Sequence, residues 1–530
     1  MKRLNIFSNM KYLVATLLFA GLLTQCKDIN DFGNMNQDPT QANNIDPGME
    51  FTTVELGAAG SRFEMWRANL IYASAITQQL AQTWWAGNFY TKNEEWVTAF
   101  WNVAYAGNGI TWLAQIKNVQ DLINNLQSNL DNDPSLVNKL AVARIMRVFI
   151  YHRVTDLYGN APYFNGGMGY IAQDYAPKYD KQSDIYTDMF KELDEAVNQL
   201  DPNQPTYGSA DLIYNGDIDQ WKRFANSLRL RLALRLVKIE LQTAQQQAEA
   251  AIDPANGGVM NSNDDMAIVP HQDGPSTGPA GINTNANSEV FAVDRPYLSQ
   301  TLVNWMNDFG DPRLEIYGEV NDPNNPVGLP NGYDASTIQN HSSWSGSFDT
   351  YIQLNTMLMD LDDPMIFQTY AEVEFMLAEA AVRWPGSNFG DAEEHYNNGV
   401  RAAMTYLTLY DATGAVIPNG QINTYLINNP FNNGGTDAEK LEQINNQYWA
   451  AVFLNGIEAW ANWRRSGFPV LEPSPVDDPN PWPGNQSNGE IPRRLLYPEV
   501  EGLLNQQNYD EAITNQGPNN FTTRVWWDAP

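Results

Sequence analysis

The stretch from Asp211 to Leu236 constrains the fold more than any other part of the chain. Asp217 precedes Gln220 by three residues, a spacing typical of a capping box at the start of a helix. Apolar residues then follow on two roughly opposite helical faces. The main face carries Trp221, Phe224, Ala225, Leu228, Leu232 and Leu236, and the narrower one carries Leu230, Leu234 and Val237. A helix that is apolar on two sides is usually buried between neighbours. The sequence therefore predicts a mostly α protein with this helix in its core.

One arginine of this helix, Arg235, falls inside the main apolar stripe. A guanidinium in the interior needs a carboxylate partner, because an unpaired buried charge is very costly. The helix expected from Ile366 to Trp384 offers Glu374, which shares a face with Leu377 and Ala378. We therefore expect a buried ion pair between Arg235 and Glu374.

The N-terminus has the pattern of a secretion signal. Lys2, Arg3 and Lys11 precede a short apolar run, Tyr12–Leu23, which is typical of a signal peptide rather than of a membrane span. The run ends in Leu23-Thr24-Gln25-Cys26, which resembles the lipobox that is cut before an acylated cysteine. Cys26 is the single cysteine of the chain. We expect a signal peptide over 1–25, a lipid anchor on Cys26, a polar tether over 26–49 and one domain over 50–530; ordinary secretion with a free thiol is the alternative.

Composition excludes several classes of function. A formal net charge of −31 argues against binding nucleic acid or anionic lipid through charge. The four histidines form no HExxH pair, and the chain has neither a phosphate loop nor a GxGxxG after a strand. Carboxylate pairs are so numerous that a glycosidase stays open by residue type. No cofactor is expected, although the acidic clusters at 261–265 and 360–363 offer oxygen ligands for Ca²⁺; solvated loop acids are the favoured interpretation of both.

The segment 256–363 differs from the rest of the chain. It is rich in Asn, Gly, Asp, Ser and Pro, with one expected helix over 296–309, but it also carries many aromatic residues. Disordered segments are poor in aromatic residues, so we expect an ordered, loop-rich insertion that lines a binding site. Outside it, apolar periodicity predicts helices over 68–85, 133–158, 179–200, 392–406 and 438–455.

Separated motifs resemble one known family. They are YHRVTDLYGNAPY at 151–163, the stretch 211–236, the helix 366–384, EAWANWRRSGFP at 458–469 and the element at 491–505. Together they resemble the SusD/RagB family of lipid-anchored, outer-membrane nutrient-binding proteins, and within it the SusD-like, starch-binding-associated subgroup. The resemblance implies tetratricopeptide-like helical repeats packed against an irregular ligand-binding part.

The resemblance also implies a function. We expect an outward-facing outer-membrane lipoprotein that is not an enzyme, binds a nutrient, most readily a glycan, and delivers it to a SusC-like TonB-dependent transporter. A peptide ligand and a surface glycoside hydrolase are the alternatives.

Two places in the chain combine aromatic rings with loop-forming residues, as sugar and peptide sites do. The first is the segment 82–90, with Trp84, Trp85, Phe89 and Tyr90, followed by Trp96; the second is Trp344, between serines in the insertion. Asn287 and Asp294 of the insertion are expected to supply hydrogen bonds to the ligand. For each ring taken alone, packing in the core is the competing interpretation.

Overall fold

The helix predicted after Asp217 is α12 (Ile218–Arg235), and it lies in the core of the computed structural model. The structure describes residues 45–107, 113–274, 283–475 and 485–530. Asp217 caps α12 as expected, because its side chain accepts a hydrogen bond from the Gln220 backbone N–H at 3.0 Å. The Gln220 side chain does not complete a capping box; it donates instead to the carbonyl oxygen of Asp264.

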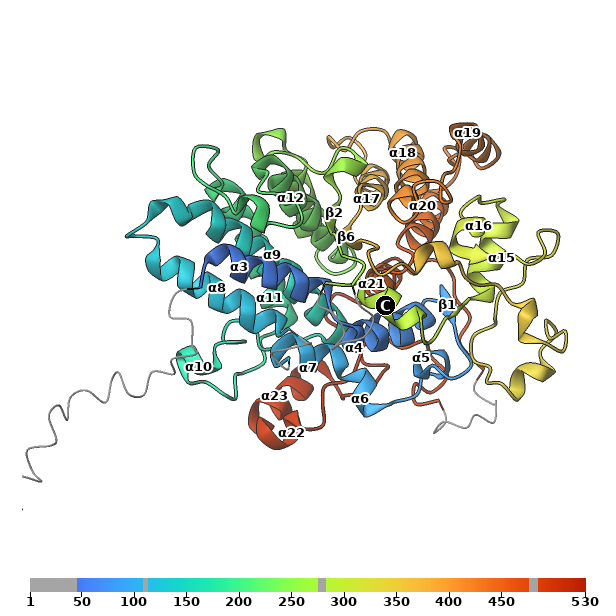
Figure 1. Cartoon of the computed structure of the whole chain (residues 1–530), viewed down its shortest axis with the longest axis horizontal. Helices are drawn as coiled ribbons and strands as arrows, with labels where there is room; N and C mark the ends of the chain where they lie inside the picture. The colour runs from blue at the N-terminus through green and yellow to red at the C-terminus, as the bar shows by residue number, and fades with distance from the viewer. Residues whose placement is uncertain (1–44, 108–112, 275–282, 476–484) are drawn as a thin grey trace, which may run out of the picture. The chain divides into compact units, whose positions relative to one another are not determined.

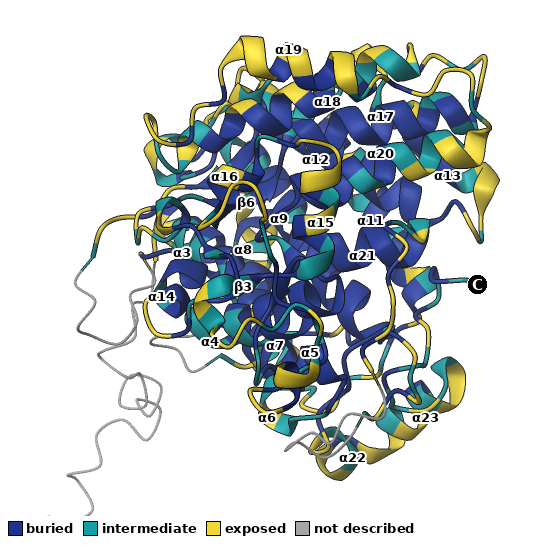
Figure 2. Ribbon diagram, turned by 90° about the vertical axis from the view of Figure 1, so that its right-hand side faces the viewer, coloured by how far each residue is buried: buried dark blue, intermediate teal, exposed yellow. Residues whose placement is uncertain are grey.

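Consecutive helices pack against each other around α12, in the order that the family resemblance implies (Figure 1). One set comprises α8 (Gln115–Asn129), α9 (Val137–Tyr158), α11 (Gln182–Gln199), α12 and α13 (Leu241–Ala251). The second set comprises α17 (Tyr370–Arg383), α18 (Ala392–Thr405), α19 (Asn419–Asn428), α20 (Asp437–Ala451) and α21 (Gly456–Ser466). In Figure 2, α12, α17 and α21 are mostly buried, whereas exposed residues predominate on α19 and α23 (Gln506–Gln516). The described chain is thus mostly helical, as predicted.

The N-terminal part of the folded unit supports these helices from the side. It contains α3 (Pro47–Ala59), α4 (Arg62–Glu64), the π-helical segment η1 (Met65–Ser74), β1 (Leu80–Ala81), α5 (Ala86–Phe89), α6 (Glu94–Val97) and α7 (Ala99–Tyr105). The predicted tether is too long at its C-terminal end, because α3 begins at Pro47. The continuous helix predicted over 68–85 is also wrong: Gln78 adopts a left-handed backbone conformation (φ 54°), which turns the chain into β1.

The insertion 256–363 is ordered over its described residues and builds two small antiparallel sheets. One has the strand order β1–β3–β5–β4, with β3 (Tyr297–Leu298), β4 (Gly318–Glu319) and β5 (Gln353–Leu354). The other pairs β2 (Ala267–Val269) with β6 (Met365–Gln368). The short helices between them are α14 (Ala286–Phe291), α15 (Gln300–Asp308) and α16 (Leu314–Tyr317), so α15 begins later than the helix predicted at 296.

The buried ion pair of Arg235 differs from the prediction. Arg235 donates to Glu458 at 2.6 Å and lies 3.4 Å from Asp156, whereas Glu374 accepts from His395 at 2.7 Å. The carboxylate of α17 that faces α12 is Glu372, which receives Arg231 at 2.9 Å. Two residues along a helix correspond to about 200° of rotation, so Glu374 points away from the side that Glu372 occupies.

Candidate functional site

Three half-buried tryptophan rings meet at the surface, and we call them the tryptophan ladder: Trp66, Trp84 and Trp96. Trp66 comes from η1, Trp84 follows β1 and Trp96 lies on α6. The ring centroids of Trp66 and Trp84 are 6.0 Å apart and those of Trp84 and Trp96 are 5.7 Å apart, both pairs edge to face. This geometry fixes the rings against one another while part of each stays open to solvent.

The carboxylate of Asp294 lies on the inner side of the ladder and accepts hydrogen bonds there. It accepts hydrogen bonds from the indole N–H of Trp66 at 3.2 Å, from that of Trp85 at 2.7 Å and from the Gln82 side chain at 3.1 Å. Burial raises the pKa of Asp294, and the indole hydrogen bonds act in the opposite direction. Asp294 was predicted to bind ligand directly; its position, with three donors already engaged, is that of a residue that orients the rings.

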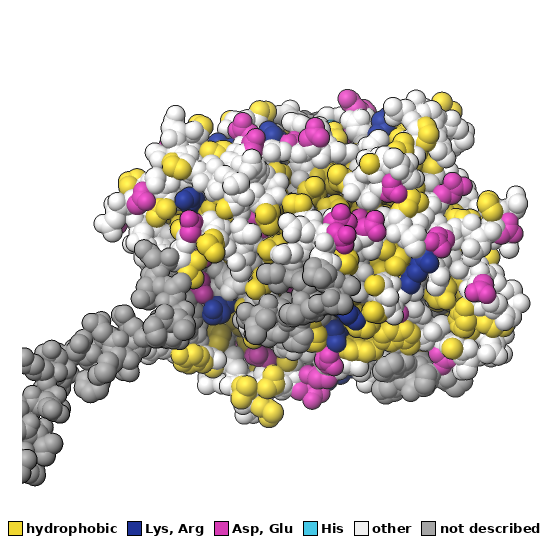
Figure 3. Space-filling view, viewed as in Figure 1, with side chains coloured by type: hydrophobic (Ala, Val, Ile, Leu, Met, Phe, Trp, Pro, Cys, Tyr) yellow, Lys and Arg dark blue, Asp and Glu magenta, His cyan; other side chains and the backbone are white. Residues whose placement is uncertain are grey.

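Cationic side chains flank the ladder. The guanidinium groups of Arg62 and Arg67 lie 5.2 Å and 5.5 Å from the ring centroid of Trp66. Arg67 is also paired with Glu95 at 2.7 Å. Figure 3 shows hydrophobic side chains gathered between the positions of α5 and α6, with basic and acidic side chains beside them. The surface therefore offers ring faces together with donors and acceptors, which is the composition of a ligand site.

Several residues of the predicted site lie in the interior instead. Trp85 is completely buried, and Phe89 and Tyr90 are 4% and 1% exposed. The reason is the close packing of α5 on η1: a Cβ at Gly87 would meet the carbonyl oxygen of Ile71 at 2.0 Å. The chain leaves β1 and turns back against the core, so these three rings are packing residues and their predicted contact with ligand is corrected.

The second predicted place, around Trp344, forms its own aromatic group, the insertion cluster: Tyr297, Tyr333, Trp344 and Phe348 packed around buried Tyr351. Trp344 is half-buried, and its ring centroid lies 5.1 Å from that of Phe348. A groove of about 300 Å³ beside it is lined by residues that include Tyr297, Phe348 and Gln353. Only two residues separate Asp294 from Tyr297, so this cluster adjoins the ladder.

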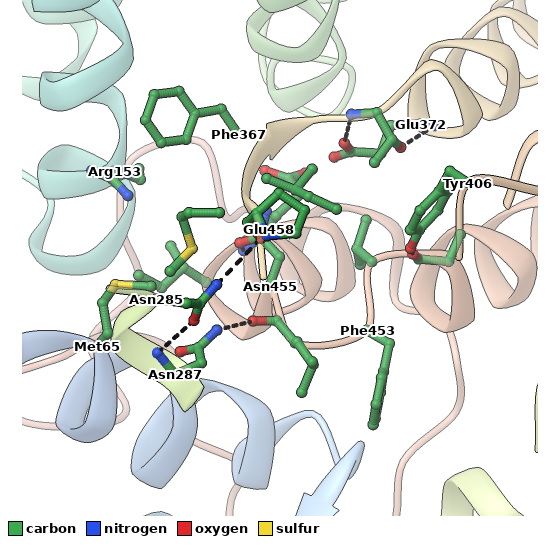
Figure 4. A pocket seen from close by; sticks show the side chains of 18 of the residues that line it. Met65, Arg153, Asn285, Asn287, Phe367, Glu372, Tyr406, Phe453, Asn455 and Glu458 are labelled. Carbon is green, nitrogen blue, oxygen red and sulfur yellow. Dashed lines mark hydrogen bonds between the residues drawn. The ribbon is translucent and has the colours of Figure 1, made fainter. Parts of the chain in front are cut away.

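Asn287 lines an interior cavity rather than the ladder (Figure 4). Its amide donates to the carbonyl oxygen of Leu454 at 3.4 Å and accepts from Asn69 at 3.3 Å. The cavity volume of about 40 Å³ has room for about three water molecules. Its wall includes Glu372 and Glu458, which pair with buried arginines. The cavity thus belongs to the core, and the ligand contact of Asn287 stays a prediction.

Neither acidic cluster has the geometry of a metal site. Across the described residues, no three His, Cys, Asp or Glu side chains converge on a point where an ion could sit. Asp265 forms an ion pair with Arg223 at 2.9 Å. Burial, together with the charges of Asp360 and Asp362, raises the pKa of Asp363 to about 8.

Sequence reasoning missed Trp66 and its neighbour Arg62. The helix predicted from the sequence begins at residue 68, after both Arg62 and Trp66. The signal was present: Ser61 and Glu64 have capping-box spacing, and both capping hydrogen bonds form in the structure. Cys26 lies outside the described residues. None of the described helices is long and apolar enough to span a bilayer.

Comparison with known proteins agrees with this architecture. The family described as "Starch-binding associating with outer membrane", SusD-like, matches residues 39–498. A solved chitin-binding protein is 33% identical, with a TM-score of 0.77, over 92% of this chain and 100% of that one. A Bacteroidetes SusD-like protein is 28% identical (TM-score 0.78, over 92% and 100% of the two chains), and a chitin-binding SusD homologue from Flavobacterium johnsoniae is 25% identical (TM-score 0.72, 91% and 98%). The comparison with curated proteins gave no match.

Proteins of this family bind nutrients and are not catalysts, which agrees with the missing enzyme motifs. The helical repeats, the loop-rich insertion and the family match over residues 39–498 lead to one conclusion: the chain belongs to the SusD-like family of outer-membrane-associated, carbohydrate-binding proteins.

Proposed function

We propose that this protein binds a glycan on the tryptophan ladder and passes it to a SusC-like TonB-dependent transporter. The observation that carries the proposal is the arrangement of Trp66, Trp84 and Trp96, three partly exposed rings that pack edge to face on one another while Trp66 donates its indole N–H to Asp294. Fixed rings lose little conformational entropy when a ligand stacks on them, so they favour binding.

A sugar suits such a surface because it has two kinds of group. Its C–H face packs on an aromatic ring, and its hydroxyl groups exchange hydrogen bonds with polar side chains at the edge. At the ladder, Arg62, Arg67 and Glu95 provide those edge groups. The adjoining insertion cluster, with Trp344 half-buried, extends the aromatic surface beyond Asp294 toward Tyr297.

Chitin oligosaccharides are the first candidates for the ligand. Two relatives, at 33% and 25% identity, are described as chitin-binding. Chitin units are uncharged, and an uncharged ligand avoids repulsion by a protein whose net charge is −31. Starch oligosaccharides are the second candidates, from the description of the family.

The anchor and the partner complete the proposal. Acylated Cys26 would hold the body at the outer membrane through the segment before Pro47, facing outward, where a barrel transporter could receive the glycan. The motif at Leu23–Cys26 and the family's outer-membrane association support this placement. Affinity purification from mild detergent should recover a TonB-dependent barrel, and a purification without any barrel would count against the partner.

Calorimetry of the purified protein tests ligand binding. Chitotetraose, maltotetraose and tetra-alanine are titrated into the wild type and into Trp84→Ala/Trp96→Ala. We expect the wild type to bind one of the sugars and the double variant to bind it at least tenfold more weakly. Phe164→Ala is the control, because Phe164 is 46% exposed and lies outside the ladder. Preferential binding of tetra-alanine would show that the ligand is a peptide rather than a glycan. Cleavage of the sugar during the titration would favour the alternative of a glycoside hydrolase.

A further inference from the structure

A second aromatic groove lies far from the ladder in the fold. It is formed where α15, α19 and α20 meet, and it has a volume of about 340 Å³. In both ribbon views α19 lies at the opposite end of the folded unit from α6, which carries Trp96 (Figures 1 and 2). The groove shares no residue with the ladder or with the insertion cluster. Its volume is at the lower end of the range for small-molecule sites, about 300–1,000 Å³.

The rings of Trp305 and Phe309 form one wall of this groove. Their centroids are 5.3 Å apart, with 44° between the ring planes. Phe309 is 46% exposed, an unusual position for so large an apolar side chain. Trp305 is half-buried and packs edge to face on Trp449 of α20, at 6.0 Å, which fixes it in position. This wall therefore consists of the fixed ring of Trp305 and, beside it, the exposed ring of Phe309.

Amide side chains form the opposite wall, and they are not all engaged. Gln443 and Gln447 donate to the hydroxyl groups of Tyr396 and Tyr425, at 3.2 Å and 2.6 Å. The side chain of Asn446, by contrast, makes no hydrogen bond to any described residue, and its buried Oδ1 has no partner.

The indole N–H of Trp305 is likewise buried without an acceptor among the residues that the structure describes. Buried polar groups are nearly always hydrogen-bonded in native proteins. An unpaired donor and an unpaired acceptor on facing elements of one groove point to a ligand or to water that bonds to them.

The charge of the groove restricts what it can hold. Its lining contains Glu439 and Glu442 and no lysine, arginine or histidine. Glu439 is engaged at the start of α20, where it accepts from the backbone N–H of Thr436 at 2.7 Å. Glu442 is exposed and makes no ion pair within the described part of the chain. An anionic ligand would be repelled here, whereas a neutral polyol can donate to the carboxylate and to Asn446.

We propose that this groove is a second carbohydrate site, for one or two neutral sugar rings, independent of the tryptophan ladder. A sugar would place its C–H face on Phe309 and Trp305 and its hydroxyl groups toward Asn446 and Glu442. A protein partner would instead need a larger surface than this groove provides. The inference does not depend on the ladder being a binding site.

The test uses a protein whose ladder has been disabled. Trp84→Ala/Trp96→Ala protein is labelled with ¹⁵N at the tryptophan indoles, and chitobiose and maltose are titrated separately while indole N–H resonances are followed by NMR. The Trp305 signal is assigned as the one that Trp305→Phe removes. We expect this signal to shift with saturation for at least one sugar. Adding Phe309→Ala should raise the apparent Kd at least tenfold.

Controls separate this site from the ladder and from loss of structure. Leu409→Ala in the same background should leave the titration unchanged, since Leu409 is 43% exposed and lies outside the groove. Far-ultraviolet circular dichroism must show that each variant is folded. A Trp305 signal unaffected by both sugars overturns the proposal, even if the intact ladder binds glycan, as does a titration that Phe309→Ala leaves unaltered. Failure of the ladder with a retained response at Trp305 would overturn only the proposed primary site.

Discussion

Two adjacent tryptophans, Trp84 and Trp85, should respond in opposite ways to substitution by alanine. Trp85 is completely buried, and its indole donates to Asp294 at 2.7 Å, whereas Trp84 is half-buried and contacts the rings of Trp66 and Trp96. If the ladder is the glycan site, Trp84→Ala should weaken binding at least tenfold, with a smaller loss of stability than Trp85→Ala. Trp85→Ala should mainly unfold the protein.

The magnitudes follow from these surroundings. Truncating a buried tryptophan leaves a cavity and costs about 3–5 kcal/mol. Trp84→Ala loses two edge-to-face contacts, each worth about 0.5–1.5 kcal/mol beyond the area that the ring buries, so we expect a loss of about 1–3 kcal/mol, smaller than that of Trp85→Ala. Loss of one stacking ring should raise the Kd of the sugar at least tenfold, which corresponds to about 1.4 kcal/mol.

Equilibrium urea unfolding, followed by far-ultraviolet circular dichroism, measures the stability of each variant, and calorimetry measures its affinity. Trp85→Phe is the matched control: it keeps one aromatic ring in the core and removes the pyrrole ring together with its hydrogen bond to Asp294, which is worth about 1.5–3 kcal/mol because the acceptor is charged. Equal losses of stability for Trp84→Ala and Trp85→Ala would refute the assignment of the two rings. A stable Trp85→Ala protein that no longer binds sugar would also refute it.

Three further predictions concern the core and the anchor. Arg235→Met should lower the free energy of unfolding by about 3–5 kcal/mol, because it leaves buried Glu458 without its closest cation; a loss below that of Glu374→Ala in urea would contradict the pairing. Burial, followed by the nearby charge of Asp211, raises the pKa of Glu55. The protonated Glu55 therefore stabilises the folded state at acidic pH, and this contribution is lost as the pH rises through the raised pKa. Glu55→Gln should therefore flatten the decline in melting temperature above pH 5, and an unchanged decline would refute this. Cys26→Ala should move the protein from the membrane to the soluble fraction, and retention on the membrane would exclude the lipid anchor.

The helices of the core could be predicted from the sequence because their signals are local. Asp217 caps α12, and Gly159 ends α9 with φ 88°, a conformation that glycine adopts without strain. The partner of Arg235 could not be predicted in this way. Helical phase identifies which carboxylates are buried, but the packing of α9 and α21 against α12 decides that Asp156 and Glu458, rather than Glu374, reach the guanidinium.

The candidate site was predictable in its composition but not in its geometry. The sequence shows that segment 82–90 is rich in aromatic residues, yet nothing local distinguishes Trp84 from Trp85. The distinction arises from the pairing of β1 with β3, where Ala81 lies opposite Tyr297. That register brings Asp294 beneath the residues that follow β1, so its carboxylate receives the Trp85 indole.

Residues 85 and 294 are 209 positions apart, and no periodicity in a sequence reports such a contact. The same contact explains why the insertion and the ladder form one functional element. Trp66 belongs to η1, in the helical part of the chain, but the acceptor of its indole N–H is contributed by the residue that precedes Arg295 and β3. The insertion supplies Val290, Phe291 and Leu298 to the same buried core as the helices, and its Asp294 supplies the carboxylate that orients Trp66. Under the proposed function, the affinity of the ladder for glycan therefore depends on the fold of a segment that supplies none of its three rings.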